Sequence, residues 1–383
     1  MRKLFSVALV LGCALFFSLF PVVPTQGAEL ELESSSAVLL DASSGQVLYE
    51  KNSHARRSPA SVTKLMTLVV AWEAIEAGKA SLSDQVETSA NAANLGGSQI
   101  WLEPGEKMSL QDLLIAIAVG SANDACVAVG EHIFGSHEAL VAKMNEKATA
   151  LGLKDTHFAN AYGYTDPNHY TSAYDMAQIG RYALRYPTIM QWVGTKVYDI
   201  RGGKPRLYNR NKLLWWYKGA DGFKTGWTSE AGYCLASTVE RDGFRMVACT
   251  LGSPRIYGNF RDSMKLYDYG FKKYSFKQLA PAGQTCGTVA VSKEAVSQVE
   301  AVVRQRVGAL VVKGQEQGIT TRVELPVRVE APVKQGQKLG EIVVLRGNEE
   351  INRVDLVAKE EVSRGSFTQQ ILKMLKAVIE CKY

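Results

Sequence analysis

The sequence has few cysteines and few histidines, and neither type is clustered. None of the six cysteines among the 383 residues forms a Cys-x-x-Cys pair, so neither a redox motif of that kind nor a disulfide framework is predicted. The five histidines lack the His-Glu-x-x-His, Cys-x-His and His-x-His spacings of zinc sites. We therefore expect no metal ion and no cofactor, and we expect His169 to make a structural hydrogen bond.

Clustered positive charge is also missing. The formal net charge is +6, yet no run of five basic residues occurs. Binding to nucleic acid needs a clustered basic face, so nucleic acid is not expected as a partner. With 46% hydrophobic and 21% charged residues, the composition is typical of a globular protein with a real core. The length allows two or three domains.

Acidic residues are absent from the first part of the chain, where none precedes Glu29. Arg2 and Lys3 stand before an uncharged apolar stretch at residues 4–20, which proline and glycine then interrupt. This pattern predicts a secretory signal peptide over residues 1–28. The protein is then exported and works at the extracytoplasmic face of the bacterial cell membrane. An uncleaved membrane anchor is the alternative, because the apolar stretch is nearly long enough to span a bilayer.

Residues 29–278 mix helical and strand patterns. Two hairpins are predicted, one near each end of this region. Apolar runs at 37–40 and 46–49 flank a turn rich in Ser and Gly, and runs at 233–239 and 244–251 flank an Asp-Gly turn. Apolar residues at helical spacing lie between the hairpins. We therefore predict an α+β domain in which an antiparallel sheet packs against helices.

Residues 279–363 show only strand patterns and predict a small all-β sandwich domain. Apolar residues alternate from 322 to 329, which predicts one half-buried strand, and Pro326 assigns that strand to an edge or a bulge. Residues 364–383 have apolar residues at helical spacing together with lysines. This predicts a C-terminal amphipathic helix on the membrane surface. A helix docked on its own β-domain is the alternative.

Ser61 and Lys64 form a Ser-x-x-Lys motif at the start of a helix predicted over residues 61–77. Side chains three residues apart lie on one helical face. A serine hydroxyl becomes a good nucleophile when a base takes its proton, and lysine can be that base if its pKa is lowered. Taken alone, the pair is more typical of a helix-capping serine beside an exposed lysine.

Two further polar motifs follow along the chain. Ser121 and Asn123 lie between two helical apolar runs, where they could relay a proton and donate a hydrogen bond to a substrate, or merely cap helices. Lys224, Thr225 and Gly226 lead into the second predicted hairpin. A strand edge carrying a lysine, a hydroxyl and a glycine suits an extended peptide that ends in a carboxylate. The alternative is that these three residues form an ordinary surface turn.

The order and spacing of these three motifs carry a resemblance to a known family. Ser61 and Ser121 are 60 residues apart, and Lys224 follows Ser121 by 103 residues. Serine β-lactamases and penicillin-binding proteins use this trio. The chain resembles the low-molecular-weight D-Ala-D-Ala carboxypeptidases of the S11 peptidase type in particular. The blocks that carry the resemblance cover residues 59–67, 121–125, 169–177, 208–211 and 221–233.

The resemblance implies a penicillin-recognising, transpeptidase-like domain and a serine carboxypeptidase reaction. Ser61 would attack the penultimate D-Ala of a peptidoglycan stem peptide that ends in D-Ala-D-Ala, and Lys64 would take its proton. Ser121 would relay a proton to the leaving amine, and the backbone N–H groups of Ser61 and Trp227 would form the oxyanion hole. β-Lactam antibiotics would acylate Ser61 covalently.

The resemblance also implies a substrate-binding set. Lys224, Thr225, Gly226 and Trp227 would line the cleft, and Arg261 would bind the substrate carboxylate, with Arg255 as a rival. Trp227 departs from the family pattern, in which a smaller aromatic residue or a histidine is more usual. Trp215 and Trp216 are expected to pack in the core or at a rim, with sugar stacking as the alternative.

Three other functions are alternatives to the carboxypeptidase. A β-lactamase is disfavoured because no glutamate lies in a recognisable deacylating motif between Asn123 and Lys224, and because of the additional β-domain. D,D-endopeptidase or transpeptidase activity on cross-links stays open. A silent peptidoglycan-binding module is disfavoured by the intact Ser61 and Lys64.

Overall fold

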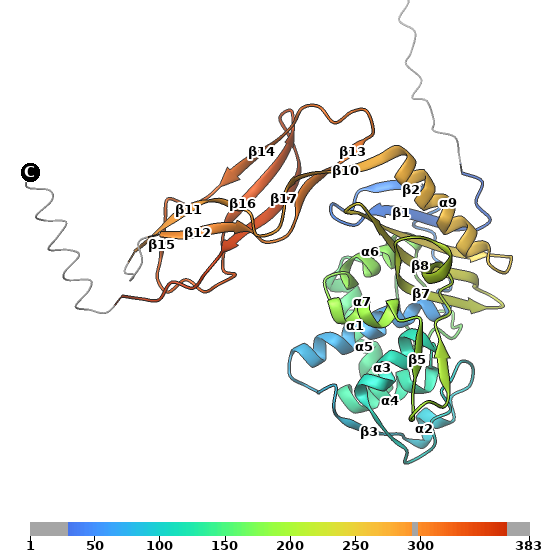
Figure 1. Ribbon diagram of the computed structural model, residues 1–383. Helices are drawn as coiled ribbons and strands as arrows, with labels where there is room; N and C mark the ends of the chain where they lie inside the picture. Colours follow the sequence, from blue (N-terminus) through green and yellow to red (C-terminus); the bar gives the residue numbers. More distant parts are fainter. Residues whose placement is uncertain (1–29, 293–297, 366–383) are drawn as a thin grey trace, which may run out of the picture. The chain divides into compact units, whose positions relative to one another are not determined.

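The structure is a computed structural model that describes residues 30–292 and 298–365 (Figure 1). The predicted signal segment at 1–28 lies outside the described residues, as does the predicted C-terminal helix from residue 366 on. Among the described residues, no helix is both long enough and apolar enough to cross a membrane.

A five-stranded antiparallel sheet organises the first region. Its strands follow the order β2-β1-β9-β8-β7. Their bounds are β1 (Ser36–Asp41), β2 (Val47–Lys51), β7 (Ala220–Thr228), β8 (Gly232–Arg241) and β9 (Phe244–Ser253). Both predicted hairpins are confirmed, since β1 pairs with β2 and β8 pairs with β9. Strands from the two ends of the region meet at the β1–β9 pair, and β7 lies at one edge.

Helices and short hairpins fill the stretch between β2 and β7 (Figure 1). The helices are η1 (Ala60–Thr63, a 3₁₀ turn), α1 (Lys64–Glu76), α2 (Ala90–Ala93), α3 (Leu110–Val119), α4 (Asn123–Phe134), α5 (His137–Ala150), α6 (Ala173–Ala183), α7 (Pro187–Gly194) and α8 (Leu213–Trp216). The hairpins are β3 (Gln85–Glu87) with β4 (Lys107–Ser109) and β5 (Val197–Asp199) with β6 (Arg206–Tyr208). A last helix, α9 (Gly258–Lys273), follows β9.

The sheet is covered on both faces. Gly270 of α9 lies against Met246, whereas Gly180 of α6 lies against Val247. Because successive side chains of a strand point to opposite faces, α9 and α6 cover opposite faces. Helix α3 is apolar nearly all round and almost fully buried, as expected of a helix at the centre of the helical layer. The Ser109 hydroxyl caps α3 by accepting the N–H of Asp112 at 3.1 Å, a common role of serine at a helix N-terminus.

The second region is all β. Its strands are β10 (Tyr274–Ala280), β11 (Thr285–Ser292), β12 (Gln298–Val303), β13 (Val307–Val312), β14 (Ile319–Glu324), β15 (Arg328–Glu330), β16 (Lys338–Arg346) and β17 (Glu349–Ala358). β10 and β13 form one antiparallel pair, and the others form a six-stranded sheet in the order β14-β16-β17-β12-β11-β15. A core made mostly of valines joins the two sheets. The predicted domain boundary at residue 279 falls inside β10.

The single strand predicted over residues 322–329 was wrong. The chain breaks there into β14 and β15, which lie at opposite edges of the six-stranded sheet. Pro326 lies in the connection between them, and Val327 beside it is 91% exposed. Proline has no backbone N–H to donate to a neighbouring strand, so a strand ends near it. The alternation of apolar and polar residues across Pro326 therefore does not correspond to one continuous strand with a buried face.

Candidate active site

Ser61 lies in the 3₁₀ turn η1, immediately before α1. The segment around Gly163 packs against this turn. Gly163 has a φ of +91° and lies against the backbone of Ala60 and Ser61. A Cβ atom at Gly163 would overlap the Ala60 carbonyl oxygen and lie 2.8 Å from the Ser61 nitrogen. Only glycine therefore allows this contact, which fixes the backbone that carries the candidate nucleophile.

Lys64 is fully buried beside Ser61. Its Nζ lies 2.9 Å from the Ser61 Oγ, 2.7 Å from the Asn123 Oδ1 and 2.6 Å from the Tyr162 carbonyl oxygen. Burial, helped by the positive charge of nearby Arg210, lowers the pKa of Lys64 to about 8. A lysine with such a pKa can give up its proton near neutral pH and then accept one from Ser61.

Ser121 and Asn123 lie where α3 gives way to α4, and both are buried. Besides accepting from Lys64, the Asn123 side chain donates its Nδ2 to the Gly96 carbonyl oxygen at 2.9 Å. The Asn123 backbone N–H donates to the Ser98 carbonyl oxygen at 2.7 Å. The amide oxygen thus orients Lys64 and one Nδ2 hydrogen binds Gly96; the second Nδ2 hydrogen is the one that could donate to the substrate, as the sequence suggested. Ser121 has a φ of +65° and lines the pocket described below.

The third motif brings edge strand β7 against η1. A Cβ atom at Gly226 would lie 2.7 Å from the Ser61 nitrogen and 2.9 Å from the Pro59 carbonyl oxygen, so glycine permits this close approach. Lys224 is buried, and its Nζ donates to the Thr225 carbonyl oxygen at 3.0 Å. Burial, followed by the charges of Lys64 and Arg210, lowers the pKa of Lys224 well below its usual value. Three cationic groups therefore influence this one site.

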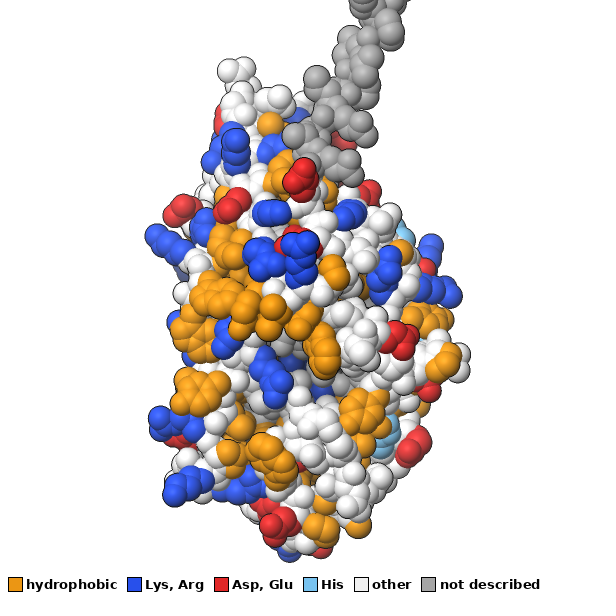
Figure 2. Space-filling model, turned by 90° about the vertical axis from the view of Figure 1, so that its right-hand side faces the viewer, with side chains coloured by type: hydrophobic (Ala, Val, Ile, Leu, Met, Phe, Trp, Pro, Cys, Tyr) orange, Lys and Arg blue, Asp and Glu red, His pale blue; other side chains and the backbone are white. Residues whose placement is uncertain are grey.

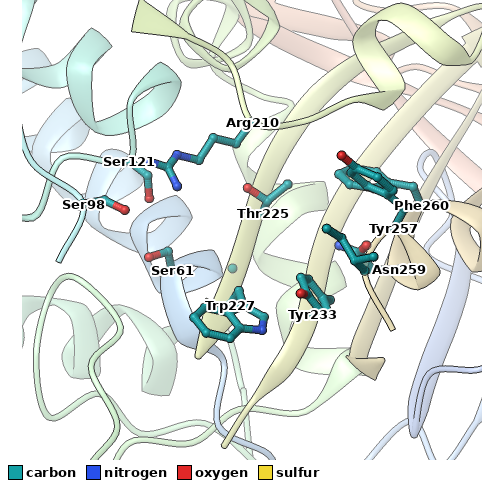
Figure 3. A pocket seen from close by; sticks show the side chains of 12 residues that line it. Ser61, Ser98, Ser121, Arg210, Thr225, Trp227, Tyr233, Tyr257, Asn259 and Phe260 are labelled. Atoms are coloured by element: carbon teal, nitrogen blue, oxygen red, sulfur yellow. The ribbon is translucent and has the colours of Figure 1, made fainter. Parts of the chain in front are cut away.

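A pocket of about 320 Å³ opens over these residues (Figure 3). It is lined by Ser61, Ser98, Ser121, Arg210, Thr225, Gly226, Trp227, Tyr233, Ile256, Tyr257, Asn259 and Phe260. No acidic residue is among these lining residues, and Arg210 is the cation among them. Ser61, Ser121, Thr225, Gly226 and Trp227, which were predicted from three separate motifs, therefore share one pocket. Its charge suits an anionic ligand.

The two arginines predicted to bind the substrate carboxylate flank the pocket-lining residues 256–260, and the Arg261 Nη1 donates to the Ile256 carbonyl oxygen at 3.4 Å. The Arg261 Nη2 is 2.9 Å from a carboxylate oxygen of Glu33, and Arg255 is 3.8 Å from the same carboxylate. Neither is among the pocket-lining residues. Arg210, which the sequence reasoning missed as a site residue, points into the pocket toward Ser121 (Figure 3). The sequence signal that could have identified Arg210 is its position in residues 208–211, one of the blocks that carry the family resemblance.

His169 supports the nucleophile turn from behind. Its Nε2 lies 2.8 Å from the Thr63 Oγ1, and its Nδ1 accepts the N–H of Ala159 at 2.9 Å. Burial lowers the pKa of His169 to about 4, so the ring is neutral at physiological pH, and Nε2 is then the nitrogen that carries the proton. The hydrogen bonds are the structural role expected of it.

The face shown in Figure 2 combines two kinds of side chain. Hydrophobic side chains gather on it around a hollow that contains basic side chains. Among the exposed large hydrophobic residues, Trp227, Ile256 and Tyr257 line the pocket and are 56%, 58% and 43% exposed. An exposed apolar surface next to a polar, cationic cleft is typical of a binding site.

Known proteins resemble this chain over both of its regions. The D-alanyl-D-alanine carboxypeptidase family, Peptidase S11, matches residues 23–255, and the C-terminal domain of penicillin-binding protein 5 matches residues 274–364. The chain is 37% identical to D-alanyl-D-alanine carboxypeptidase DacF of Bacillus subtilis, over 96% of each chain. It is 31% identical to DacA of Escherichia coli, over 90% of this chain and 88% of the relative.

Solved structures give the same picture. Penicillin-binding protein 5 from Haemophilus influenzae superimposes with a TM-score of 0.69 at 31% identity, covering 88% of this chain and 99% of the other. A mutant of the Streptomyces K15 DD-transpeptidase superimposes with a TM-score of 0.60 at 28% identity, covering 63% of this chain and 99% of the other. The shorter protein therefore matches only part of the present chain.

Proposed function

Because the chain belongs to the D-alanyl-D-alanine carboxypeptidase family, we propose that Ser61 carries out the reaction of this serine-type enzyme. That reaction removes the terminal D-Ala from peptidoglycan stem pentapeptides and serves cell-wall biogenesis. The observation that carries the assignment to Ser61 is the 2.9 Å contact between its Oγ and the Nζ of Lys64. A nucleophile within hydrogen-bond reach of a base with a lowered pKa is the arrangement that acyl transfer needs.

Acylation begins when neutral Lys64 takes the Ser61 proton. The Ser61 Oγ then bonds to the carbonyl carbon of the penultimate D-Ala, and the backbone N–H groups of Ser61 and Trp227 stabilise the oxyanion. Each such donor contributes about 3 kcal/mol. The bond to the terminal D-Ala breaks, and its nitrogen receives a proton through Lys64 and Ser121. Water, activated by Lys64, later hydrolyses the ester and restores the Ser61 hydroxyl.

The substrate carboxylate is bound by Arg210 and Thr225 in this proposal, in place of Arg261. Arg210 lines the pocket, whereas the Arg261 guanidinium is already paired with Glu33. A guanidinium can hold a carboxylate with two parallel hydrogen bonds. Lys224 is buried, and its Nζ donates to the Thr225 carbonyl oxygen, so in this proposal it supports the strand edge that carries Thr225.

The test is incubation with a pentapeptide ending in D-Ala-D-Ala, followed by mass analysis of the products. The expected product is the tetrapeptide plus free D-Ala. A β-lactam should also add covalently to Ser61, because its strained amide resembles the scissile bond and the resulting ester hydrolyses slowly. Peptide mass spectrometry should find the adduct on Ser61. An adduct on another residue, or no adduct under saturating drug, would contradict the mechanism.

Export and membrane attachment complete the proposal, and both rest on the sequence pattern. The N-terminal segment at 1–28 directs export, and the apolar stripe of residues 366–383 binds the membrane surface. Each large side chain of that stripe could contribute roughly 1.5–3 kcal/mol when buried, and each lysine about 1 kcal/mol near anionic lipid. Deleting residues 366–383 should release an active enzyme into the soluble exported fraction. A truncated protein that stays in the membrane pellet would indicate an uncleaved N-terminal anchor instead.

A further inference from the structure

The pocket has an apolar wall that a D-Ala-D-Ala terminus does not require. Ile256, Tyr257 and Phe260 form this wall, at the start of α9. Ile256 and Tyr257 remain 58% and 43% exposed. A terminal D-Ala offers only one methyl group to the protein, so most of this surface would stay in water when that substrate is bound. Exposed apolar clusters of this kind mark a surface that a ligand covers.

The wall is held in place by a neighbouring ring. The Trp216 ring lies edge-on to Tyr257 and to Phe260, with centroid distances of 5.3 and 5.6 Å. The Tyr257 and Phe260 rings are themselves 6.2 Å apart. Edge-to-face contacts at these distances are favourable. The rings therefore present a preformed surface, which reduces the conformational entropy that a ligand would have to remove on binding.

The wall lies on the side of the pocket where the leaving residue belongs. If Arg210 and Thr225 bind the substrate carboxylate, the Cα atom that bears this carboxylate lies next to Thr225. Figure 3 shows Thr225 between Arg210 on one side and Tyr257 and Phe260 on the other. The side chain on that Cα atom can therefore extend toward the wall, while Ser61 still reaches the preceding carbonyl carbon.

We propose that the enzyme accepts stem peptides whose terminal residue is a large apolar or aromatic D-amino acid, and that Ile256, Tyr257 and Phe260 form the subsite for its side chain. The inference rests on the proposed carboxypeptidase function and widens its substrate class. The chemistry balances as it does for D-Ala. The amide bond to the terminal residue breaks, the acyl group passes to Ser61, and the leaving amine gains the proton that Ser61 lost.

The test compares three pentapeptides that end in D-Ala-D-Ala, D-Ala-D-Leu and D-Ala-D-Phe. For the wild-type enzyme, kcat/KM for the D-Leu and D-Phe peptides should equal or exceed that for the D-Ala peptide. The informative variant is Tyr257→Asn, because Tyr257 has a φ of +64° and asparagine tolerates this conformation. It should lower kcat/KM for the D-Phe peptide about tenfold more than for the D-Ala peptide, the scale of discrimination that apolar pockets achieve.

Trp215→Ala is the matched control. Trp215 is next to Trp216 in the chain and is 43% exposed, as Tyr257 is. Its ring lies beside Lys196 and Lys212, and it is not among the pocket-lining residues. Its loss should leave the ratio between the two substrates unchanged. Efficient hydrolysis of the D-Ala peptide alone, or an unchanged ratio in Tyr257→Asn, would overturn the inference and leave the proposed function intact. Failure to hydrolyse any of the three peptides would overturn both.

Discussion

The two regions of the molecule treat polar groups in opposite ways. The first region buries several ionisable side chains, among them Lys64, Lys224 and Asp124. In the described part of the second region, from Tyr274 on, the fully buried side chains are all hydrophobic. Its charged residues form exposed ion pairs instead, such as Arg353 with Glu324 and Glu350.

The difference separates a reactive domain from a supporting one. Burying an amine costs free energy, and a fold retains such a group only where its partners or its function compensate. Burial also shifts the pKa, and this shift makes Lys64 a usable base. Exposed ion pairs add little stability and perturb little chemistry. The contrast therefore predicts that substitutions of similar size have very different effects in the two regions.

The largest expected effect comes from Lys64→Ala. Loss of the base should slow acylation by a β-lactam by about 10²–10⁴-fold, while the circular dichroism spectrum stays native. Its counterpart is Lys338→Ala, which removes contacts of 2.6 and 2.7 Å to Glu341 and Asp355 on the surface of the second region. That variant should acylate at the wild-type rate and lose at most about 1 kcal/mol of stability. If the folded Lys64→Ala protein were acylated at the wild-type rate, Lys64 would not be the base, and the two lysines would not differ in their effect on acylation.

Two glycines, one in each region, test whether the backbone of the first region is packed more tightly than that of the second. Gly163→Ala should lower the free energy of unfolding by about 3 kcal/mol or more, because strain at its positive φ adds to the overlap with Ala60. Gly336 in the second region also has a positive φ, of +76°, but no atom lies within 4 Å of its would-be Cβ. Gly336→Ala should cost only about 1–2 kcal/mol. Equal losses in urea unfolding would show that the close packing beneath Ser61 does not matter.

The pH dependence of acylation tests whether burial tunes Lys64. Its pKa is lowered to about 8, so the neutral, proton-accepting form is the minor one below pH 8 and the major one above it. The acylation rate should therefore rise about tenfold per pH unit from pH 6 to pH 7 and level off above pH 8. Stopped-flow measurements with a chromogenic β-lactam would give the profile. A rate that is constant from pH 6 to pH 9 would contradict Lys64 as the base.

Two arginines of the first region provide the smallest effect. Arg210→Ala should reduce carboxypeptidase turnover by about 10–100-fold, since a hydrogen bond to a charged group contributes about 1.5–3 kcal/mol. The same variant should be nearly normal on a thioester substrate that lacks the carboxylate. Arg261→Ala removes a half-exposed pair with Glu33 and one long hydrogen bond to the Ile256 carbonyl oxygen, and it should reduce turnover of both substrates little and equally. Reversed results for the two arginines would restore the assignment that the sequence first suggested.

Short-range patterns made much of the first region predictable. The hairpins at β1–β2 and β8–β9 follow from turn residues between apolar runs, and α3 follows from its serine cap and apolar periodicity. These signals act over a few residues, so the sequence contains them in full. The Ser-x-x-Lys, Ser-x-Asn and Lys-Thr-Gly motifs were equally visible, because their order along the chain is itself the signal.

Only the tertiary structure decided which polar groups meet. Arg210 lines the pocket and Arg261 pairs with Glu33, and both facts depend on contacts between distant segments. The engagement of the Asn123 amide by Gly96 and the break of the strand at Pro326 were hidden for the same reason. Sequence determined the elements and the candidate nucleophile, since local geometry specifies them. Long-range packing determined the burial of Lys64, and with it the pKa that makes the chemistry feasible.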